Sequence, residues 1–189
     1  WDREGNRGFE LKGRAVGILG YGNTGSAVAQ KLRGFGVQIL AYDKYKKGFG
    51  NEWVTEVTEQ ELLAQSDIIT LHVPLTEETT LWLNADRLSR CKKGIYLLNL
   101  SRGRVVDLEA VEQAMKEGKI LGFAADVLPI EPPWTDPNEG RKASLDRLME
   151  SNHTIFSPHV GGWTVESYHK ISAILFDKML KLYDIQSNL

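Results

Sequence analysis

The chain has 189 residues, of which 42% are hydrophobic and 25% are charged, close to the composition of ordinary globular domains. This composition excludes a disordered, collagen-like or coiled-coil protein, and the length suits one domain or slightly more. The net charge of −2 and the pI of about 6.1 exclude a basic surface for general nucleic-acid binding.

Residues 1–12 are polar and show no periodicity, so we predict a linker or arm there and a domain over residues 13–189. From Arg14 onward, short apolar runs alternate with segments of helical periodicity. Strands are predicted at 15–19, 37–42, 67–73, 95–100, 120–127 and 153–157. Helices are predicted at 24–35, 59–64, between the N-cap Asp107 and Gly118, near 144–149 and at 164–184.

The order of these elements predicts the fold class. The run Ala15-Val16-Gly17-Ile18-Leu19 shows no polar alternation, as in a strand that is buried on both faces of a parallel sheet. Repeated strand–helix–strand units predict right-handed crossovers and helices on both faces of that sheet. We therefore expect an α/β fold with a Rossmann-type, doubly wound parallel sheet. The Pro-rich stretch 131–148 is predicted to be a surface loop that includes the short helix near 144–149.

The segment Gly20-Tyr21-Gly22-Asn23-Thr24-Gly25 follows the first predicted strand and opens the first predicted helix. In this setting Gly20 permits a tight turn, Gly22 lets the backbone approach a pyrophosphate, and Gly25 lets the helix pack against the strand. The helix N-terminus adds unpaired N–H groups and the positive end of its dipole, which both favour phosphates. Three glycines alone would mark only a turn, but in this context they predict a dinucleotide site.

Asp43 lies 18 residues after Gly25, at the end of the second predicted strand. This spacing matches the acid that accepts hydrogen bonds from the adenosine ribose hydroxyls. Because a carboxylate there would repel a 2′-phosphate, we expect NAD rather than NADP as the cofactor. Three lysines that follow Asp43 could meet a phosphate and leave NADP open; they are Lys44, Lys46 and Lys47.

Three charged residues stand at or just beyond the C-terminal ends of successive predicted strands. They are Arg102, Glu131 and His159. Ligands bind at that edge of open α/β sheets. Each residue has a plain alternative, since Arg102 could be a surface cation, Glu131 could shape a turn, and His159 could be merely solvated. Their shared position favours a catalytic site.

With the segments 99–107, 126–132 and 158–164, and with His72-Val73-Pro74-Leu75-Thr76 and Thr79, the sequence resembles the D-isomer-specific 2-hydroxyacid dehydrogenases. Within that family it is most similar to the D-3-phosphoglycerate dehydrogenases. The resemblance implies an oxidoreductase that transfers a hydride between NAD and a D-2-hydroxy acid. Its partner would be a small-molecule 2-hydroxy or 2-oxo acid, expected to be 3-phosphoglycerate.

The resemblance also implies roles for individual residues. His159 would be the general acid/base, and Glu131 would hold its imidazole and raise its pKa. Arg102 would bind the substrate's carboxylate and carbonyl oxygens and polarise the carbonyl. Asp126 would contact the nicotinamide carboxamide, whereas for His72 packing at a strand end is an equal alternative to a cofactor contact. The implied cofactor-binding residues are Gly20, Gly22, Asn23, Thr24, Gly25, Asp43, His72, Pro74, Thr79, Leu100, Ser101, Arg102, Asp126, His159 and Gly161.

Several conspicuous residues receive no role in this interpretation. His153, His169 and Cys91 are assigned to packing or to the surface, and no metal site is predicted. Trp134 could be a partner contact or a lid over the cofactor. Glu131, where the formate dehydrogenase branch has a glutamine, argues against that branch.

The sequence also predicts the cellular location and the oligomeric state of the protein. No apolar run approaches the roughly 18 residues of a membrane span, so no membrane partner is expected. The lone Cys91 cannot form an intrachain disulfide, and the N-terminus lacks the order of a signal peptide, which favours the cytoplasm. By the same resemblance, we expect a homodimer formed through the nucleotide domain.

The chain begins at Trp1 without an initiating Met, as an excised piece would. Relatives carry a second domain that supplies much of the substrate site, so we expect this chain to bind NAD but to be poorly active alone. An NAD-sensing regulatory or corepressor-like module of the same fold is the alternative function. The glycine segment does not separate the two.

Overall fold

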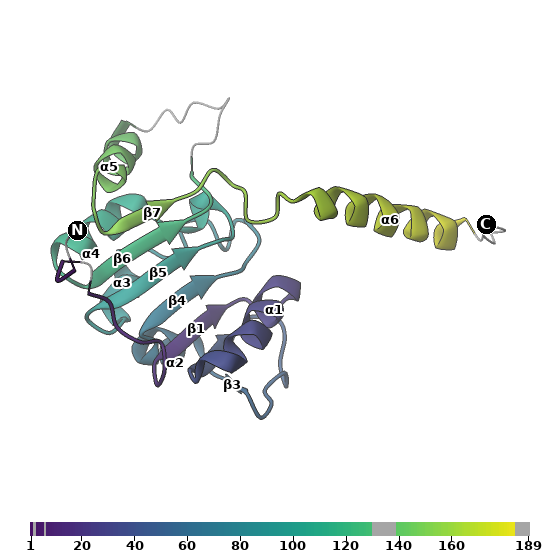
Figure 1. The fold of residues 1–189 in the computed structure, drawn as a ribbon, viewed down its shortest axis with the longest axis horizontal. Helices are drawn as coiled ribbons and strands as arrows, with labels where there is room; N and C mark the ends of the chain where they lie inside the picture. Colours follow the sequence, from purple (N-terminus) through teal and green to yellow (C-terminus); the bar gives the residue numbers. More distant parts are fainter. Residues whose placement is uncertain (2, 6, 130–138, 184–189) are drawn as a thin grey trace.

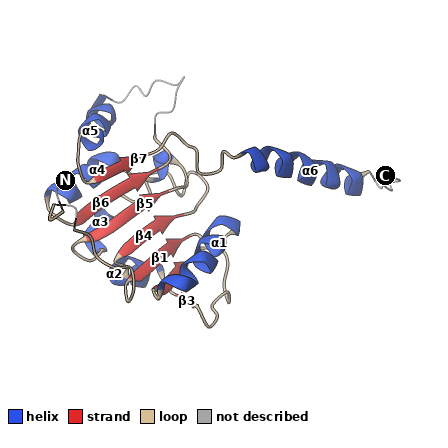
Figure 2. Cartoon of the chain, viewed as in Figure 1, coloured by secondary structure: helices blue, strands red, loops and turns tan. Residues whose placement is uncertain are grey.

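A computed structural model describes residues 1, 3–5, 7–129 and 139–183. Its strands form one parallel sheet (Figures 1 and 2). The strands are β1 (Ala15–Leu19), β2 (Gln38–Tyr42), β3 (Val54–Glu56), β4 (Ile68–Leu71), β5 (Ile95–Asn99), β6 (Ile120–Ala125) and β7 (Thr154–Phe156). The helices are α1 (Asn23–Leu32), α2 (Glu59–Gln65), α3 (Ala85–Arg90), α4 (Leu108–Lys116), α5 (Glu139–Met149) and α6 (Val165–Leu182), with 3-10 turns η1 (Arg33–Phe35) and η2 (Gly103–Val105).

The strand order is β3-β2-β1-β4-β5-β6-β7, and every neighbouring pair is parallel. The chain moves outward from β1 to β3 and then crosses back to β4 on the other side of β1. Helix α1 packs on β1 from one face, while α2, α3, α4 and α5 contact one another along the opposite face (Figure 1). This arrangement confirms the predicted Rossmann-type fold, and its topological switch point lies between β1 and β4.

The core explains why the apolar runs became central strands. All five residues of β1 are buried, as predicted for a strand covered on both faces. Ile18, Ile69 and Leu71 have no measurable exposure, and Leu97 is 1% exposed. Side chains that alternate along these strands supply the cores of the two faces.

The end signals of α4 were predicted correctly. The Asp107 side chain accepts hydrogen bonds from the backbone N–H groups of Glu109 (3.1 Å) and Ala110 (3.3 Å). Gly118 follows the helix with a positive φ of 66°, which an L side chain rarely adopts. The aspartate therefore satisfies the first free N–H groups, and the glycine reverses the chain into β6.

Several predicted boundaries were wrong. The helix at 24–35 is α1 followed by the tighter turn η1, the strands at 67–73 and 120–127 stop at Leu71 and Ala125, and α5 begins at Glu139. Two elements, β3 and α3, were not predicted. They are three and six residues long, too short to show a periodicity.

The two ends of the chain differ in how they lie relative to the sheet. Helix α6 begins at its N-cap Thr164 and extends away from the sheet (Figure 1), and none of its residues is buried. Ile171 and Leu175 are 58% and 55% exposed. Near the N-terminus, the Phe9 ring packs edge-on against Tyr96 of β5 with a centroid distance of 5.1 Å, so this part of the arm covers the sheet. Within the described residues, no helix is long and apolar enough to cross a membrane.

Candidate functional site

The glycine segment forms the turn between β1 and α1, and each glycine has a different structural reason. Gly20 has φ +88°, and a Cβ there would lie 2.7 Å from the His72 carbonyl oxygen. A Cβ on Gly25 would lie 2.0 Å from the Gly20 carbonyl oxygen, so only glycine lets α1 begin this close to the turn. Gly22 differs, because nothing lies within 4 Å of its Cβ position. The space beside Gly22 is open to a ligand.

Asp43 lies beside this turn, at the end of β2. Its Oδ2 accepts a hydrogen bond from the Tyr21 N–H (2.8 Å), and its Oδ1 accepts from the N–H groups of Tyr45 and Lys46 (2.9 Å each). Burial acts to raise the pKa of Asp43, but these three bonds outweigh it and hold that pKa below its ordinary value. The group is thus a fixed carboxylate. Oδ2 retains a lone pair that can accept a hydrogen bond from a hydroxyl.

A cavity of about 320 Å³ lies at the switch point, within the usual size of ligand pockets. Its walls come from the ends of β1, β2 and β4 and from the loops that follow them. Among the predicted cofactor residues, it is lined by Gly20, Gly22, Asp43, His72, Pro74 and Thr79. The tertiary structure therefore brings together these residues from three separate segments.

His72 presents a polar atom without a protein partner. Its Nε2 lies 2.9 Å from the Thr70 hydroxyl, whereas its Nδ1 is buried and has no hydrogen-bond partner among the described residues. Burial lowers the pKa of His72 and keeps the imidazole neutral. A buried polar atom is costly unless it is paired, so Nδ1 is suited to a bound polar group.

Thr79 holds the loop after β4 in shape. Its hydroxyl donates to the Pro74 carbonyl oxygen (2.6 Å) and accepts from the Thr76 N–H (2.8 Å). These bonds bend the loop from residue 74 to residue 79 into one wall of the cavity. Thr79 therefore positions this wall, whether or not it also contacts a cofactor.

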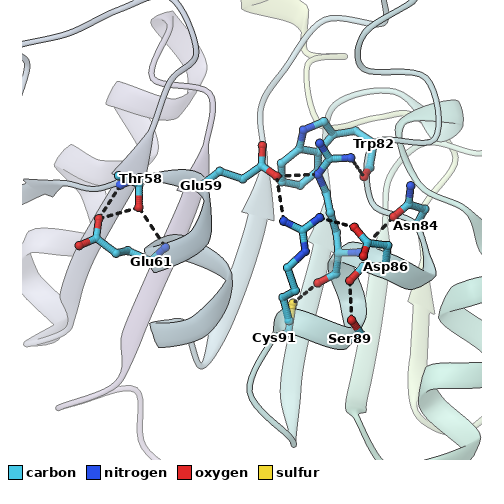
Figure 3. A network of polar contacts seen from close by, with 10 residues as sticks. Thr58, Glu59, Glu61, Trp82, Asn84, Asp86, Ser89 and Cys91 are labelled. Atoms are coloured by element: carbon cyan, nitrogen blue, oxygen red, sulfur yellow. Dashed lines mark hydrogen bonds and ion pairs between the residues drawn. The ribbon is translucent and has the colours of Figure 1, made fainter.

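The cavity is also lined by a polar pair from α2 and α3 that sequence reasoning missed. The Arg87 Nε donates to Glu59 Oε1 (2.8 Å), and its Nη1 donates to the Trp82 carbonyl oxygen (2.9 Å). Its guanidinium carbon lies 4.5 Å from the centroid of the Trp82 ring. Figure 3 shows the Glu59 carboxylate directed from α2 toward α3 and Trp82. The pair ties α2 to α3 at the cavity. Because Glu59 and Arg87 are 28 residues apart in the chain, no local sequence pattern predicted their contact.

The end of β5 forms a turn around Asn99, which is 1% exposed. Asn99 Oδ1 accepts from the N–H and hydroxyl of Ser101 (3.1 and 2.8 Å), and its Nδ2 donates to the Arg102 carbonyl oxygen (3.0 Å). A Cβ on Gly103 would lie 2.0 Å from the Leu128 carbonyl carbon, so this turn packs directly on the chain that follows β6. Arg102 is thereby held at the exposed edge of the sheet, next to that chain.

Asp126, just after β6, organises the loop after β7. Its Oδ1 accepts from the Ser157 hydroxyl (2.5 Å) and the Val160 N–H (2.9 Å), and its Oδ2 accepts from the Gly161 N–H (2.8 Å). Burial opposes ionisation, yet these bonds, together with the electrostatic effect of His159, keep the pKa of Asp126 lowered. The visible contacts of Asp126 are with this loop, and its contact with a carboxamide stays a prediction.

His159 stands on that loop with φ +55°, in the left-handed region that non-glycine residues seldom occupy. Such strain persists where the surroundings impose it, and here Asp126 holds Val160 and Gly161, the next two residues. His159 is exposed at the same edge of the sheet as Arg102. Its expected partner Glu131 and the aromatic residue Trp134 lie outside the described residues.

The predicted residues thus form two groups on the C-terminal edge of the sheet. The first lines the cavity at β1, β2 and β4, and α1 opens at Asn23 beside it. The second follows β5, β6 and β7 and contains Leu100, Ser101, Arg102, Asp126, His159 and Gly161. Sequence reasoning missed Asn99, Ser157, Glu59 and Arg87. It also missed Glu78, which lines the cavity and forms an ion pair with Lys44. Of these, only Asn99, within the matching segment 99–107, carried a signal.

Comparisons with known proteins agree with a dinucleotide site at this edge of the sheet. Residues 1–161 match the model of the D-isomer specific 2-hydroxyacid dehydrogenase, NAD binding domain. The chain belongs to this family. It is 35% identical over 190 aligned residues to a D-3-phosphoglycerate dehydrogenase of Haemophilus influenzae, covering 100% of this chain and 45% of the relative. It is 36% identical over 159 residues to a D-lactate dehydrogenase of Treponema pallidum, covering 82% of this chain and 48% of the relative.

Solved structures of 2-hydroxyacid dehydrogenases share the fold. The D-lactate dehydrogenase of Aquifex aeolicus, crystallised with NAD and lactic acid, superposes with a TM-score of 0.82 at 30% identity. The match covers 98% of this chain and 59% of that one. The chain spans about half the length of the curated relatives that it matches.

NAD is therefore the cofactor of this 2-hydroxyacid dehydrogenase domain. The site has the features that NAD requires. Gly22 leaves room for a pyrophosphate, Asp43 keeps an acceptor for a ribose hydroxyl, and His72 Nδ1 is a polar atom without a hydrogen-bond partner in the described part of the chain. The ten-residue helix α1 also begins at Asn23 without an acidic residue in its first turn, so its positive end is not neutralised there.

Proposed function

We propose that the chain is the coenzyme-binding part of a dehydrogenase that interconverts 3-phosphoglycerate and its 2-oxo acid. The observation that carries this proposal is the loop after β7, which Asp126 holds so that His159 stands in a strained conformation at the edge of the sheet. The preference for 3-phosphoglycerate is supported by the Haemophilus influenzae relative, which aligns over the whole chain.

The chain supplies binding and proton transfer. Bound NAD supplies the hydride acceptor at this edge of the sheet. Arg102 binds the substrate's carboxylate and carbonyl oxygens through its guanidinium fork and polarises the carbonyl. In the full-length enzyme, His159 would take the proton of the hydroxyl during oxidation and return it during reduction. Glu131 orients the imidazole.

The proposal also covers the domain organisation, the cellular location and the oligomeric state of the enzyme. Residues 1–12 are an arm and residues 13–189 are the nucleotide domain, while the remaining half of the full-length enzyme completes the substrate site. The enzyme is a cytoplasmic homodimer that associates through this domain. Because half of the substrate site lies elsewhere, the 189-residue chain alone is expected to bind NAD without appreciable turnover.

The first test is NAD binding to the 189-residue chain, followed by the quenching of tryptophan fluorescence or by calorimetry. We expect saturable binding that Asp43→Ala weakens at least about tenfold, since charge-assisted hydrogen bonds contribute about 1.5–3 kcal/mol. Glu52→Ala, an exposed acid outside the cavity, is the matched control. A chain that folds but does not bind NAD would overturn the proposal.

The second test uses the full-length enzyme with 3-phosphoglycerate, D-lactate, glyoxylate and hydroxypyruvate as separate substrates. We expect the highest kcat/KM with 3-phosphoglycerate, and His159→Ala should lower kcat by roughly 10²–10⁴-fold. Preference for another acid would correct the substrate alone. Tight NAD binding without turnover of any 2-hydroxy acid would favour the regulatory module instead.

A further inference from the structure

The loop after β2 carries three lysines that could attract a 2′-phosphate, and the structure shows where each ammonium group lies. Lys46 Nζ donates to the Tyr21 carbonyl oxygen at 3.3 Å, and Lys47 Nζ donates to the Asp43 carbonyl oxygen at 3.0 Å. Lys44 Nζ lies 2.8 Å from Glu78 Oε1. Among the described residues, Lys44 is thus the one of the three lysines that forms an ion pair with an acidic side chain.

Glu78 also binds the neighbour of Lys44. Its second oxygen, Oε2, accepts a short hydrogen bond from the Tyr45 hydroxyl. The Glu78 side chain therefore joins the loop after β2 to the loop after β4, 33 residues along the chain from Tyr45. Lys44, Tyr45 and Glu78 all line the cavity, together with Asp43.

We propose that Glu78 is a coenzyme-specificity residue, which favours NAD over NADP by holding Lys44 in an ion pair in the lining of the cavity. The inference rests on the proposed binding of NAD in this cavity. It goes beyond the role of Asp43, because it concerns the cation that could compensate for the charge of Asp43.

The charges explain the effect. A 2′-phosphate on the ribose would approach the Asp43 carboxylate. The lowered pKa of Asp43 keeps this carboxylate ionised at neutral pH, so it repels the negatively charged phosphate. Two lysines could offset this repulsion. The charge of Lys46 already acts on Asp43, and its ammonium group donates to the Tyr21 carbonyl oxygen, whereas Lys44 directly follows Asp43 in the chain and is held by Glu78. While Glu78 neutralises Lys44, the phosphate would have to compete with a carboxylate for the same ammonium group. NAD has no such phosphate and loses nothing.

The decisive variant is Glu78→Gln, which removes the charge and keeps the size. Its amide oxygen can still accept from the Tyr45 hydroxyl, so the two loops remain joined. Kd values for NAD and NADP are measured on the 189-residue chain by calorimetry. We expect the ratio of the Kd for NADP to the Kd for NAD to fall about fivefold, because the released Lys44 gains a charge-assisted bond to the 2′-phosphate at a partly screened site.

Two further variants make the result specific. Glu77→Gln removes the same charge from the adjacent residue, which is exposed and does not line the cavity, and it should change neither Kd by more than about 1.5-fold. Adding Lys44→Ala to Glu78→Gln should abolish the gain for NADP. Both results together would assign the effect to the Lys44–Glu78 pair rather than to net charge.

The inference is wrong if Glu78→Gln does not lower the ratio of the Kd for NADP to the Kd for NAD, or if Lys44→Ala does not reverse the gain. It is also wrong if Glu77→Gln gives the same gain. These outcomes differ from failure of the proposed function, in which the wild-type chain would bind neither dinucleotide.

Discussion

Two glycines in the turn between β1 and α1 allow an effect on folding stability to be distinguished from an effect on NAD affinity. A Cβ at Gly25 would lie 2.0 Å from the Gly20 carbonyl oxygen, far inside the ordinary contact distance of about 3.4 Å or more. In Gly25→Ala, α1 and the turn must therefore move apart by about 1 Å or more. Overpacking of this kind costs about 1–3 kcal/mol, which exceeds the gain of up to about 1 kcal/mol from replacing a helical glycine by alanine.

Gly22→Ala is the matched variant. The Gly22 backbone has φ −80° and ψ −158°, which an L residue adopts freely, and its Cβ position is open. We expect this variant to keep its stability within about 1 kcal/mol of the wild-type value, which is roughly the difference between glycine and the poorer N-cap alanine. The added methyl group instead occupies the space left for the pyrophosphate, so NAD affinity should fall at least about tenfold.

The assay combines two measurements on each variant: urea unfolding followed by circular dichroism, and NAD binding by calorimetry under native conditions. Gly25→Ala should lower the unfolding midpoint clearly, and Gly22→Ala should weaken NAD binding with little change in that midpoint. Equal destabilisation by both variants would refute the reasoning. So would a Gly22→Ala variant that binds NAD as the wild-type chain does.

Three other predictions concern the rest of the chain. Asp126→Asn turns an amide N–H toward one of its three donors, so the free energy of unfolding should fall by about 1.5–3 kcal/mol in urea titrations; an unchanged value would contradict the role given to Asp126. Burial raises the pKa of the Cys91 thiol from 9.0 to about 11. The folded state therefore holds this proton more tightly, and the stability that wild type has relative to Cys91→Ala should fall as pH rises from about 9 to about 11; a pH-independent difference would contradict this. Replacing the exposed Ile171 and Leu175 of α6 by serine should change the thermal midpoint by less than about 2 °C, whereas a larger loss would show that α6 packs on the domain.

Much of the fold could be predicted from local sequence, because the patterns that mark a turn, a helix cap or a buried strand involve residues that are close in the chain. The glycine turn, the Asp107 cap and the apolar run of β1 each predicted an element that the structure confirms. The short elements β3 and α3 escaped prediction, because a few residues fit strand and helix patterns equally well. Asn84, which caps α3 by accepting from the Arg87 N–H, was the available signal for that helix.

The sequence by itself determined the class of fold, the dinucleotide turn and the residues at the strand ends. The tertiary structure alone decided which distant side chains meet: Asp126 with the loop after β7, Arg87 with Glu59, and Glu78 with Lys44. The reason is the parallel sheet, which brings the C-terminal ends of successive strands to one edge although a whole crossover separates them in the chain. Side chains that meet across such an edge leave no periodic trace in the sequence, because their pairing depends on how neighbouring loops pack.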